Sequence, residues 1–425
     1  MKIAINAQID PASGVGGVES VIIGLVRALG RLTDGDEKYV LITNPRHPRW
    51  LDAYLGANQT VVTPQSERHG SAGAKKRNLV TATTREAGRF LRRLNPPPPS
   101  FPTPRISNGF VESLGCDVVH FPYQYFEICS LPSIYNPHDL QHRHFPQFFT
   151  PEGWIRKDIE YRAGCEYAQT VVAGSEWVKN DVCFQYNINP GKVAVIPWAP
   201  PTQAYTAATK EENASTRAKL NLPENFAFFP AMTWPHKNHL RLLEALALLK
   251  KRHGLVVPLV CTGNRGSFWP KIEQAIETLG LRDQVRFLGL VSREELQFVY
   301  RSCGFVVVPT LFEAASGPVF EAWDAGAAVA CSTVTSLPQQ VGDAALLFDP
   351  YDVPAIAEAV RTLHDHPQVC EEFVAKGRRR LNDFNWERTA RAYRAVYRRA
   401  AHRTLGEEDQ RLLAWDWSQD DTKKV

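Results

Sequence analysis

Short apolar runs alternate with helical patterns along nearly the whole chain, and this alternation limits the folds that the chain can adopt. The runs that predict strands in the first half are Lys2–Gln8, Tyr39–Asn44, Thr60–Thr63, Asp117–Tyr123, Ser133–Asn136, Thr170–Ala173 and Lys192–Ile196. Those in the second half are Phe226–Ala231, Pro258–Thr262, Val285–Gly289, Phe305–Pro309, Ala328–Ser332 and Ala345–Phe348. Between the runs, residues such as Val18, Ile22 and Leu25 recur at helical spacing. Apolar strands separated by helices predict parallel sheets covered by helices on both faces, which is an α/β fold.

The segment from Pro200 to Asn225 interrupts this pattern, because it is polar and has no long apolar run. We therefore predict two doubly wound, Rossmann-like domains, residues 1–199 and 225–384, joined by a linker at 200–224 and facing each other across a central cleft. Ligands of such sheets bind outside the carboxyl ends of the strands. Motifs at these ends are therefore the candidates for function.

Composition argues against several classes of protein. No apolar run reaches the roughly 18 residues of a membrane-spanning helix, and the start of the chain is too strand-like for a signal peptide, so we expect a cytoplasmic location. The eight cysteines are scattered and form no Cys-x-x-Cys pair, which disfavours zinc and a disulfide framework. A net charge of +4 is too small to indicate nucleic acid as a partner.

Residues 64–107 form a basic insertion that ends in the run Pro96–Pro99. One interpretation is a solvated, partly disordered insertion. The other is a basic helix from about Thr83 to Leu94, by which the segment 75–93 touches an anionic acceptor or the inner face of a membrane as a peripheral contact.

The most informative motif follows the predicted strand Phe305–Pro309. It reads Phe312-Glu-Ala-Ala-Ser-Gly-Pro-Val-Phe-Glu321, so that two carboxylates flank a turn of small residues. Pro318 suits the first position of a helix, and N–H groups at a helix N-terminus bind anions such as a diphosphate. Carboxylates beside a phosphate repel it, but they accept hydrogen bonds from sugar hydroxyls. The motif therefore predicts a site for a sugar nucleotide.

Two other turns follow predicted strands. Ser13-Gly-Val-Gly-Gly-Val-Glu19 allows the backbone to approach a ligand closely, although a purely structural turn is the alternative. It is not the dinucleotide pattern, because Glu19 stands where the third glycine belongs, and this disfavours a Rossmann oxidoreductase. Lys237 lies near the start of a helix that Asn238 can cap. A cation is unfavourable there unless it meets an anion such as phosphate; a solvated surface lysine is the alternative.

The segment His138-Asp-Leu-Gln-His142-Arg-His144 follows a further predicted strand. Three histidines can indicate a metal, but no H-E-x-x-H pattern or orienting partner is evident, so we predict no metal ligand. A histidine at a strand end is better placed to bond a sugar hydroxyl or a main-chain carbonyl. Loop histidines without a role are the alternative.

Together these residues resemble the retaining glycosyltransferases of family four, which have the GT-B fold. The resemblance rests on Glu313-x7-Glu321 with Gly317-Pro318, on Lys237-Asn238, on Gly16-Gly17-x-Glu19 and on His138-Asp139, and it covers residues 1 to about 395. It implies a metal-independent enzyme that moves a hexose from a nucleoside diphosphate sugar to a saccharide or lipid-linked saccharide acceptor, in polysaccharide or glycan assembly. It also implies that 385–425 hold a helix that returns to the first domain, followed by a tail.

The resemblance assigns roles to the matching positions. Catalytic residues are Glu313, which contacts the hexose, Lys237, which neutralises the leaving diphosphate, and His138. Glu321 holds the ribose. The other donor-binding positions are Gly16, Gly17, Gly263, Leu288, Gly289, Leu290, Ser316, Gly317, Pro318 and Val319. The acceptor is expected near His138, Asp139 and His142. The sequence Trp234-Pro-His-Lys-Asn-His is similar to that of mannosyltransferase-like members, which favours GDP-mannose as the donor over a UDP-sugar.

Two departures from the family pattern bear on the site. No arginine precedes Lys237 within Ala231–Trp234, so Thr233, His236, a residue elsewhere or backbone N–H groups must help to neutralise the diphosphate. The turn after Glu313 is Ala-Ala-Ser-Gly-Pro rather than Gly-Phe-Gly-Leu-Pro, which alters the hexose pocket. Because no further carboxylate is an evident nucleophile, we favour front-side attack with the departing phosphate as proton acceptor. A nucleotide-sugar epimerase, a phosphorylase and a non-catalytic binding scaffold are the alternatives on this architecture.

Overall fold

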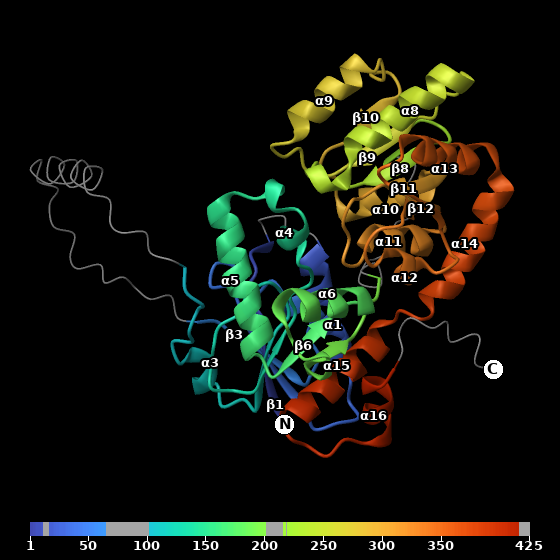
Figure 1. Ribbon diagram of the computed structural model, residues 1–425. Helices are drawn as coiled ribbons and strands as arrows, with labels where there is room; N and C mark the ends of the chain where they lie inside the picture. Colours follow the sequence, from blue (N-terminus) through green and yellow to red (C-terminus); the bar gives the residue numbers. More distant parts are fainter. Residues whose placement is uncertain (12–16, 65–101, 201–215, 218, 416–425) are drawn as a thin grey trace, which may run out of the picture.

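The computed structural model describes residues 1–11, 17–64, 102–200, 216–217 and 219–415, and within them the chain forms two lobes (Figure 1). The first lobe is built on a parallel sheet of seven strands in the order β3-β2-β1-β4-β5-β6-β7. The second is built on a parallel sheet of six strands in the order β10-β9-β8-β11-β12-β13. Both sheets carry buried apolar clusters on their two faces. The predicted α/β class with two doubly wound domains is confirmed.

The elements of the first lobe alternate between strands and helices. The strands are β1 (Lys2–Ala7), β2 (Lys38–Thr43), β3 (Gln59–Val62), β4 (Val118–Phe121), β5 (Ser133–Tyr135), β6 (Thr170–Ala173) and β7 (Val193–Val195). The helices are α1 (Gly17–Arg31), α3 (Phe110–Ser113), α4 (Gln141–His144), α5 (Pro151–Tyr167) and α6 (Glu176–Tyr186), with short 3-10 turns η2 (Asp52–Tyr54), η3 (Pro146–Phe148) and η4 (Pro190–Lys192).

The second lobe repeats the pattern. Its strands are β8 (Ala227–Pro230), β9 (Leu259–Thr262), β10 (Val285–Phe287), β11 (Phe305–Val308), β12 (Ala328–Ser332) and β13 (Leu346–Phe348). Its helices are α8 (His239–His253), α9 (Trp269–Thr278), α10 (Arg293–Ser302), α11 (Gly317–Ala325), α12 (Leu337–Val341), α13 (Val353–Asp365) and α14 (Pro367–Leu381), with the 3-10 turn η6 (Pro235–Lys237). For every strand of both lobes, the first and last residues lie within two residues of the bounds of the apolar run that predicted it.

Strands are buried on both faces because helices cover both sides of each sheet. In β1, Ile3 and Ile5 pack with α1 in one core, whereas Ala4 packs with Val40 of β2 in the other. In β8, Phe229 and Phe228 are divided in the same way between the two cores of the second lobe. This two-sided burial explains why the strands are continuously apolar in the sequence.

Helix α15 (Trp386–Ala400) returns from the second lobe to the first and packs on α1, as the red and blue ribbons of Figure 1 show. The Trp386 ring occupies the space beside Gly24 of α1, where any side chain would lie within 2.1 Å of it. Arg394 holds the pKa of Asp34 well below its usual range, and Arg398 bonds Glu37 at 2.7 Å. These contacts, with α16 (Glu407–Leu413) packed behind, make the C-terminal helices part of the first lobe.

A buried polar network fixes α15 against the sheet. His120 of β4 donates from Nε2 to Asn136 Oδ1 at 2.7 Å and accepts at Nδ1 from the Tyr397 hydroxyl at 2.8 Å. Asn136 Nδ2 donates to the Tyr393 hydroxyl at 2.7 Å. Burial lowers the pKa of His120 to about 4, so the ring is neutral at physiological pH. Because these polar atoms are partners of one another, the network positions the helix against the sheet.

Several predictions from the sequence lie outside the described residues. These are the basic segment 75–93 with its helix from Thr83 to Leu94, the Pro run, and Gly16. The domain limits at 199, 225 and 385 stay predictions. Of the helices in the described part of the chain, none is long and apolar enough to cross a membrane.

The network predicts the effect of removing one hydroxyl. Tyr393→Phe leaves Asn136 Nδ2 without its acceptor in a fully buried site, so we expect the free energy of unfolding to fall by about 1–3 kcal/mol. Tyr351→Phe is the matched control, since Tyr351 is 54% exposed. Denaturant titration measures both variants. Equal stability of the two would contradict a structural role of the network.

Candidate functional site

The candidate site lies where the central strands of the second sheet end. Strands β8 and β11 are neighbours, so the turns that follow them meet at one edge. Lys237 closes the turn after β8, and Glu313 follows β11. Lys237 Nζ donates to Glu313 Oε2 at 2.8 Å, and the side chains are only 17% and 13% exposed. The anion beside Lys237, which the sequence suggested would be a phosphate, is here a carboxylate of the protein.

The backbone of Glu313 is held by the turn after β12. The N–H of Glu313 donates to Thr335 Oγ1 at 3.1 Å, and its carbonyl accepts from Ser336 Oγ at 2.7 Å. Ser336 Oγ also reaches the carbonyl of Ala314 at 2.6 Å. Thr335 and Ser336 were not among the residues predicted for the site. Their only sequence signal is a pair of hydroxyl residues after the predicted strand Ala328–Ser332.

The turn between the two glutamates differs in part from expectation. Helix α11 begins at Gly317, so Pro318 is its second residue rather than its first. The N–H of Ser316 donates to Gln340 Oε1 at 2.8 Å, and Gln340 Nε2 donates back to the Ser316 carbonyl at 2.9 Å.

Ser316 and Val319 have side chains that are fully buried. Any contact of these two residues with the donor would therefore be made by their backbone, and their place in the donor site stays a prediction. The N–H groups of Gly317 and Val319 lie in the first turn of α11, where N–H groups have no partner within a helix. They remain the donors that this turn can offer to an anion.

Glu321 points from the second turn of α11 toward α10. Its Oε2 accepts a hydrogen bond from the Tyr300 hydroxyl at 2.6 Å. Burial raises the pKa of Glu321, and the bond from Tyr300 opposes that effect. The two residues line one hollow with Arg293 and Asp324. Tyr300, which no motif in the sequence indicated, fixes the orientation of the Glu321 carboxyl through this bond.

The turns after β9 and β10 complete the edge. Gly263 has φ 120°, and a Cβ there would lie 2.4 Å from the carbonyl oxygen of Ala231, so only glycine fits. Its N–H donates to the carbonyl of Gly289 at 2.8 Å, and Gly289 itself has φ 75°. Leu288 is half-buried, whereas Leu290 is 73% exposed. The two glycines thus bring the turns after β8, β9 and β10 close together.

The segment around Lys237 corrects two expectations. Asn238 has φ 64° and does not cap α8; its Nδ2 donates to the carbonyls of Pro309 and Pro350, both at 2.9 Å. Thr233 is engaged with the carbonyl of Asn264 and the N–H of Gly266. Burial lowers the pKa of His236 to about 2, so its ring is neutral. Neither Thr233 nor His236 can therefore replace the missing arginine as a cation.

His138 and Asp139 follow strand β5 and both form hydrogen bonds within the first lobe. His138 has φ 62° and is 5% exposed; its Nε2 donates to the carbonyl of Pro122 at 2.8 Å, and burial lowers its pKa. That bond to a main-chain carbonyl is one of the two partners predicted. Asp139 is half-buried and accepts from the N–H of Gln141.

His142 is 1% exposed and packs among Phe149, Trp154 and Tyr161. It contacts Asp158 at 3.3 Å. These aromatic rings enclose the His142 ring, and a role of His142 in acceptor binding stays a prediction. Gly17, by contrast, is exposed at the start of α1, with open space where a Cβ would stand.

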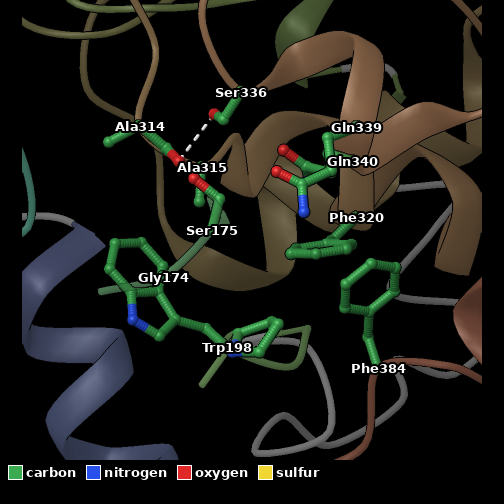
Figure 2. Close-up of a pocket in the computed structure, with 11 residues that line it drawn as sticks. Gly174, Ser175, Trp198, Ala314, Ala315, Phe320, Ser336, Gln339, Gln340 and Phe384 are labelled. Carbon is green, nitrogen blue, oxygen red and sulfur yellow. Dashed lines mark hydrogen bonds between the residues drawn. The ribbon is translucent and has the colours of Figure 1, made fainter. Parts of the chain in front are cut away.

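The two lobes meet beside Glu313. Phe312 packs edge-on against Trp177 of the first lobe, with ring centroids 5.6 Å apart, and also contacts His144 at 5.3 Å. Figure 2 shows the adjoining hollow, in which Trp198 and Gly174 of the first lobe face Ala314 and Ala315 of the glutamate turn. The small side chains of this turn therefore border a space between the lobes.

Neither metal-binding clusters nor disulfides are found in the part of the chain that the structure describes. There, no group of three or more His, Cys, Asp or Glu side chains is arranged to hold a metal ion. All eight cysteines are free. The charged groups near this edge are the pair of Lys237 with Glu313 and, in the hollow beside α11, Glu321 with Arg293.

Comparison with known proteins connects this edge to a chemistry. Residues 15–199 match the family "Glycosyltransferase Family 4", and residues 210–380 match "Glycosyl transferases group 1". The chain is 29% identical to O-antigen chain mannosyltransferase B of Escherichia coli over 281 residues, which cover 62% of this chain and 73% of that protein. It is 30% identical over 250 residues to D-inositol 3-phosphate glycosyltransferase of Streptomyces avermitilis, covering 56% of this chain and 53% of that protein.

The fold has solved counterparts. Sucrose-phosphate synthase from Thermosynechococcus elongatus superposes with a TM-score of 0.68 at 20% sequence identity, covering 94% of this chain and 98% of that one. At this level of identity the likeness concerns the fold.

Gly263 and Gly289 differ in a testable way. Gly263→Ala places a Cβ against the backbone of Ala231, so we expect it to lower the free energy of unfolding by clearly more than Gly289→Ala, which costs only the left-handed conformation, roughly 1–2 kcal/mol. Thermal or denaturant unfolding of both variants tests this. Equal losses would mean that the close approach at Gly263 is not needed.

His239 predicts a pH dependence of stability. The ring lies between Phe229 and Phe287, neither nitrogen has a partner within the described residues, and burial lowers its pKa to about 3. Below pH 6.5 the His239 ring is protonated in the unfolded chain but stays neutral in the folded protein. The free energy of unfolding therefore falls as the pH falls. Between pH 6.5 and 5 this amounts to about 2 kcal/mol.

His239→Phe should therefore flatten the decline in stability between pH 7 and pH 5. His253→Gln, at the exposed end of the same helix, should leave it unchanged. Unfolding titrations at the two pH values would contradict the account if both variants kept the slope of the parent protein.

Proposed function

Because this chain belongs to the family 4 glycosyltransferases and has their GT-B fold, we propose that it transfers a hexose, with retention of configuration, from a nucleoside diphosphate sugar to a hydroxyl of a saccharide or lipid-linked saccharide. The ion pair of Lys237 with Glu313 supports this proposal most strongly. It places a cation and a hydrogen-bond acceptor 2.8 Å apart at a strand edge, where a sugar phosphate offers the matching groups.

The donor would replace the contacts that the residues make with each other. Its diphosphate accepts hydrogen bonds from Lys237 and from the N–H groups at the start of α11. Its hexose hydroxyls donate to Glu313. Its ribose hydroxyls donate to Oε1 of Glu321, since Oε2 is bonded by Tyr300. The base lies on the surface made by Gly263, Gly289 and Leu290. Gly17 brings the N-terminus of α1 toward the same diphosphate.

The barrier to transfer is the departure of an anionic diphosphate from an oxocarbenium-like centre. A preorganised cation aimed at the leaving oxygens lowers that barrier. The proton of the acceptor hydroxyl passes to the departing phosphate oxygen as the new glycosidic bond forms on the same face. His138, neutral and fixed by the carbonyl of Pro122, positions the acceptor side rather than carrying charge.

Mannose is the hexose that we favour, with GDP-mannose as donor and a UDP-sugar as the alternative. The support is the name of the Escherichia coli relative and the Trp-Pro-His-Lys-Asn-His segment. We place the reaction in polysaccharide assembly on the cytoplasmic side. Thermal-shift measurements with GDP, UDP, ADP and their sugar conjugates identify the donor, because a ligand that binds the folded state raises its stability.

Two substitutions separate the roles at the ion pair. Lys237→Ala removes the cation that stabilises the leaving group and should lower turnover about a hundredfold or more. Glu313→Gln should also lower turnover, but it frees Lys237, so calorimetry should show nucleoside diphosphate bound at least as tightly as by the parent protein. Lys250→Ala, on the exposed side of α8, is the control.

Unchanged turnover in Lys237→Ala would remove this residue from the mechanism. Conversion of the nucleotide sugar without any acceptor would indicate an epimerase instead. Absence of nucleoside diphosphate release with every donor and acceptor would indicate a binding scaffold.

A further inference from the structure

Glu19 is the residue of the glycine-rich turn to which the proposed function gives no role. It lies in the first turn of α1, where a carboxylate is favourable because of the helix dipole. Its side chain is 18% exposed, and its Oε1 accepts from Nη2 of Arg293 at 2.7 Å. Arg293 lies 274 residues further along the chain and belongs to the second lobe, so the ion pair bridges the two lobes.

Arg293 stands where the dipole of its own helix disfavours a cation. It is the first residue of α10, directly after the N-cap Ser292. The capping box of Ser292 with Glu295 already completes that end of the helix. The partner in the first lobe supplies the reason for a cation at this position.

The place of the pair gives it a consequence for the ligand. Arg293 lines the same hollow as Glu321, which holds the ribose in the proposed function, and Tyr300, which fixes the carboxyl of Glu321. Glu19 follows Gly17 on the helix whose N-terminus approaches the diphosphate. The pair therefore joins the helix end on one side of the donor to the ribose pocket on the other.

We propose that Glu19 and Arg293 are positioning residues that form a clamp across the donor site. The clamp holds the N-terminus of α1 over the second lobe and keeps the lobes closed on the nucleoside diphosphate sugar. Its ligand assignment rests on the proposed function, whereas its effect on closure does not. The contact of Phe312 with Trp177 is a second place where side chains of the two lobes meet.

Small-angle X-ray scattering of the ligand-free protein tests closure directly. Glu19→Gln and Arg293→Gln remove one charge each with little change in size, and both should shift the radius of gyration to a larger value. The double exchange Glu19→Arg with Arg293→Glu should restore the parent value. Glu358→Gln is the control, because it breaks an exposed pair with Arg361 within α13 and should change nothing. Melting temperatures near that of the parent verify that each variant is folded.

The kinetic test separates positioning from general stability. In the single variants the KM for the donor should rise about two- to fivefold, the range expected for losing one partly exposed ion pair, while kcat changes less. The double exchange should recover much of the KM. An unchanged radius of gyration in both single variants, or a double exchange no better than either, would overturn the clamp.

The two proposals can fail separately. If the radius of gyration rises in the single variants but the protein transfers a hexose from no donor, the clamp would be supported and the proposed function refuted. If the protein transfers a hexose but neither substitution changes its radius of gyration, the clamp alone would be refuted.

Discussion

The ion pair between Lys237 and Glu313 is the interaction on which the site depends. The two charges come from the ends of adjacent strands and are both largely shielded from water, so neither can lose its partner without a replacement. A ligand that enters must therefore bring an anion for the lysine and hydroxyl donors for the carboxylate. In the proposed function a sugar phosphate meets this requirement, whereas a simple anion would leave Glu313 unpaired and a neutral sugar would leave Lys237 unpaired.

The rest of the second lobe keeps these groups in place. The side chain of Asn238 connects the turn after β8 to the carbonyls of Pro309, which follows β11, and of Pro350. Ser336 bonds the backbone carbonyl of Glu313. Gln340 fixes the start of α11 through both polar atoms of its amide. Preorganisation of this kind lowers the cost of reorienting groups during the reaction. The first lobe is equally fixed, because α15 carries the chain back and locks onto the sheet through His120 and Asn136.

Much of this arrangement could be predicted from the sequence, because buried parallel strands are read directly from apolar runs. The strands of the described residues lie where these runs predicted them, and Lys237 and Glu313 meet at the ends of adjacent strands. Contacts between distant segments could not be predicted, since no local pattern encodes them. Lys237 meets Glu313 rather than an open anion site, Asn238 serves as a bridge instead of a cap, and His142 is enclosed by aromatic rings. The pair of Glu19 with Arg293 joins residues that are adjacent only after both lobes have formed.

The central claim is that Lys237, which pairs with Glu313 in the ligand-free protein, bonds the diphosphate when the donor is bound. A structure of the protein with bound GDP or UDP tests it most directly. The account predicts Lys237 Nζ at about 2.7–3.2 Å from a phosphate oxygen, with the ribose on Glu321. A diphosphate bound elsewhere, while Lys237 remains paired with Glu313 alone, would contradict it.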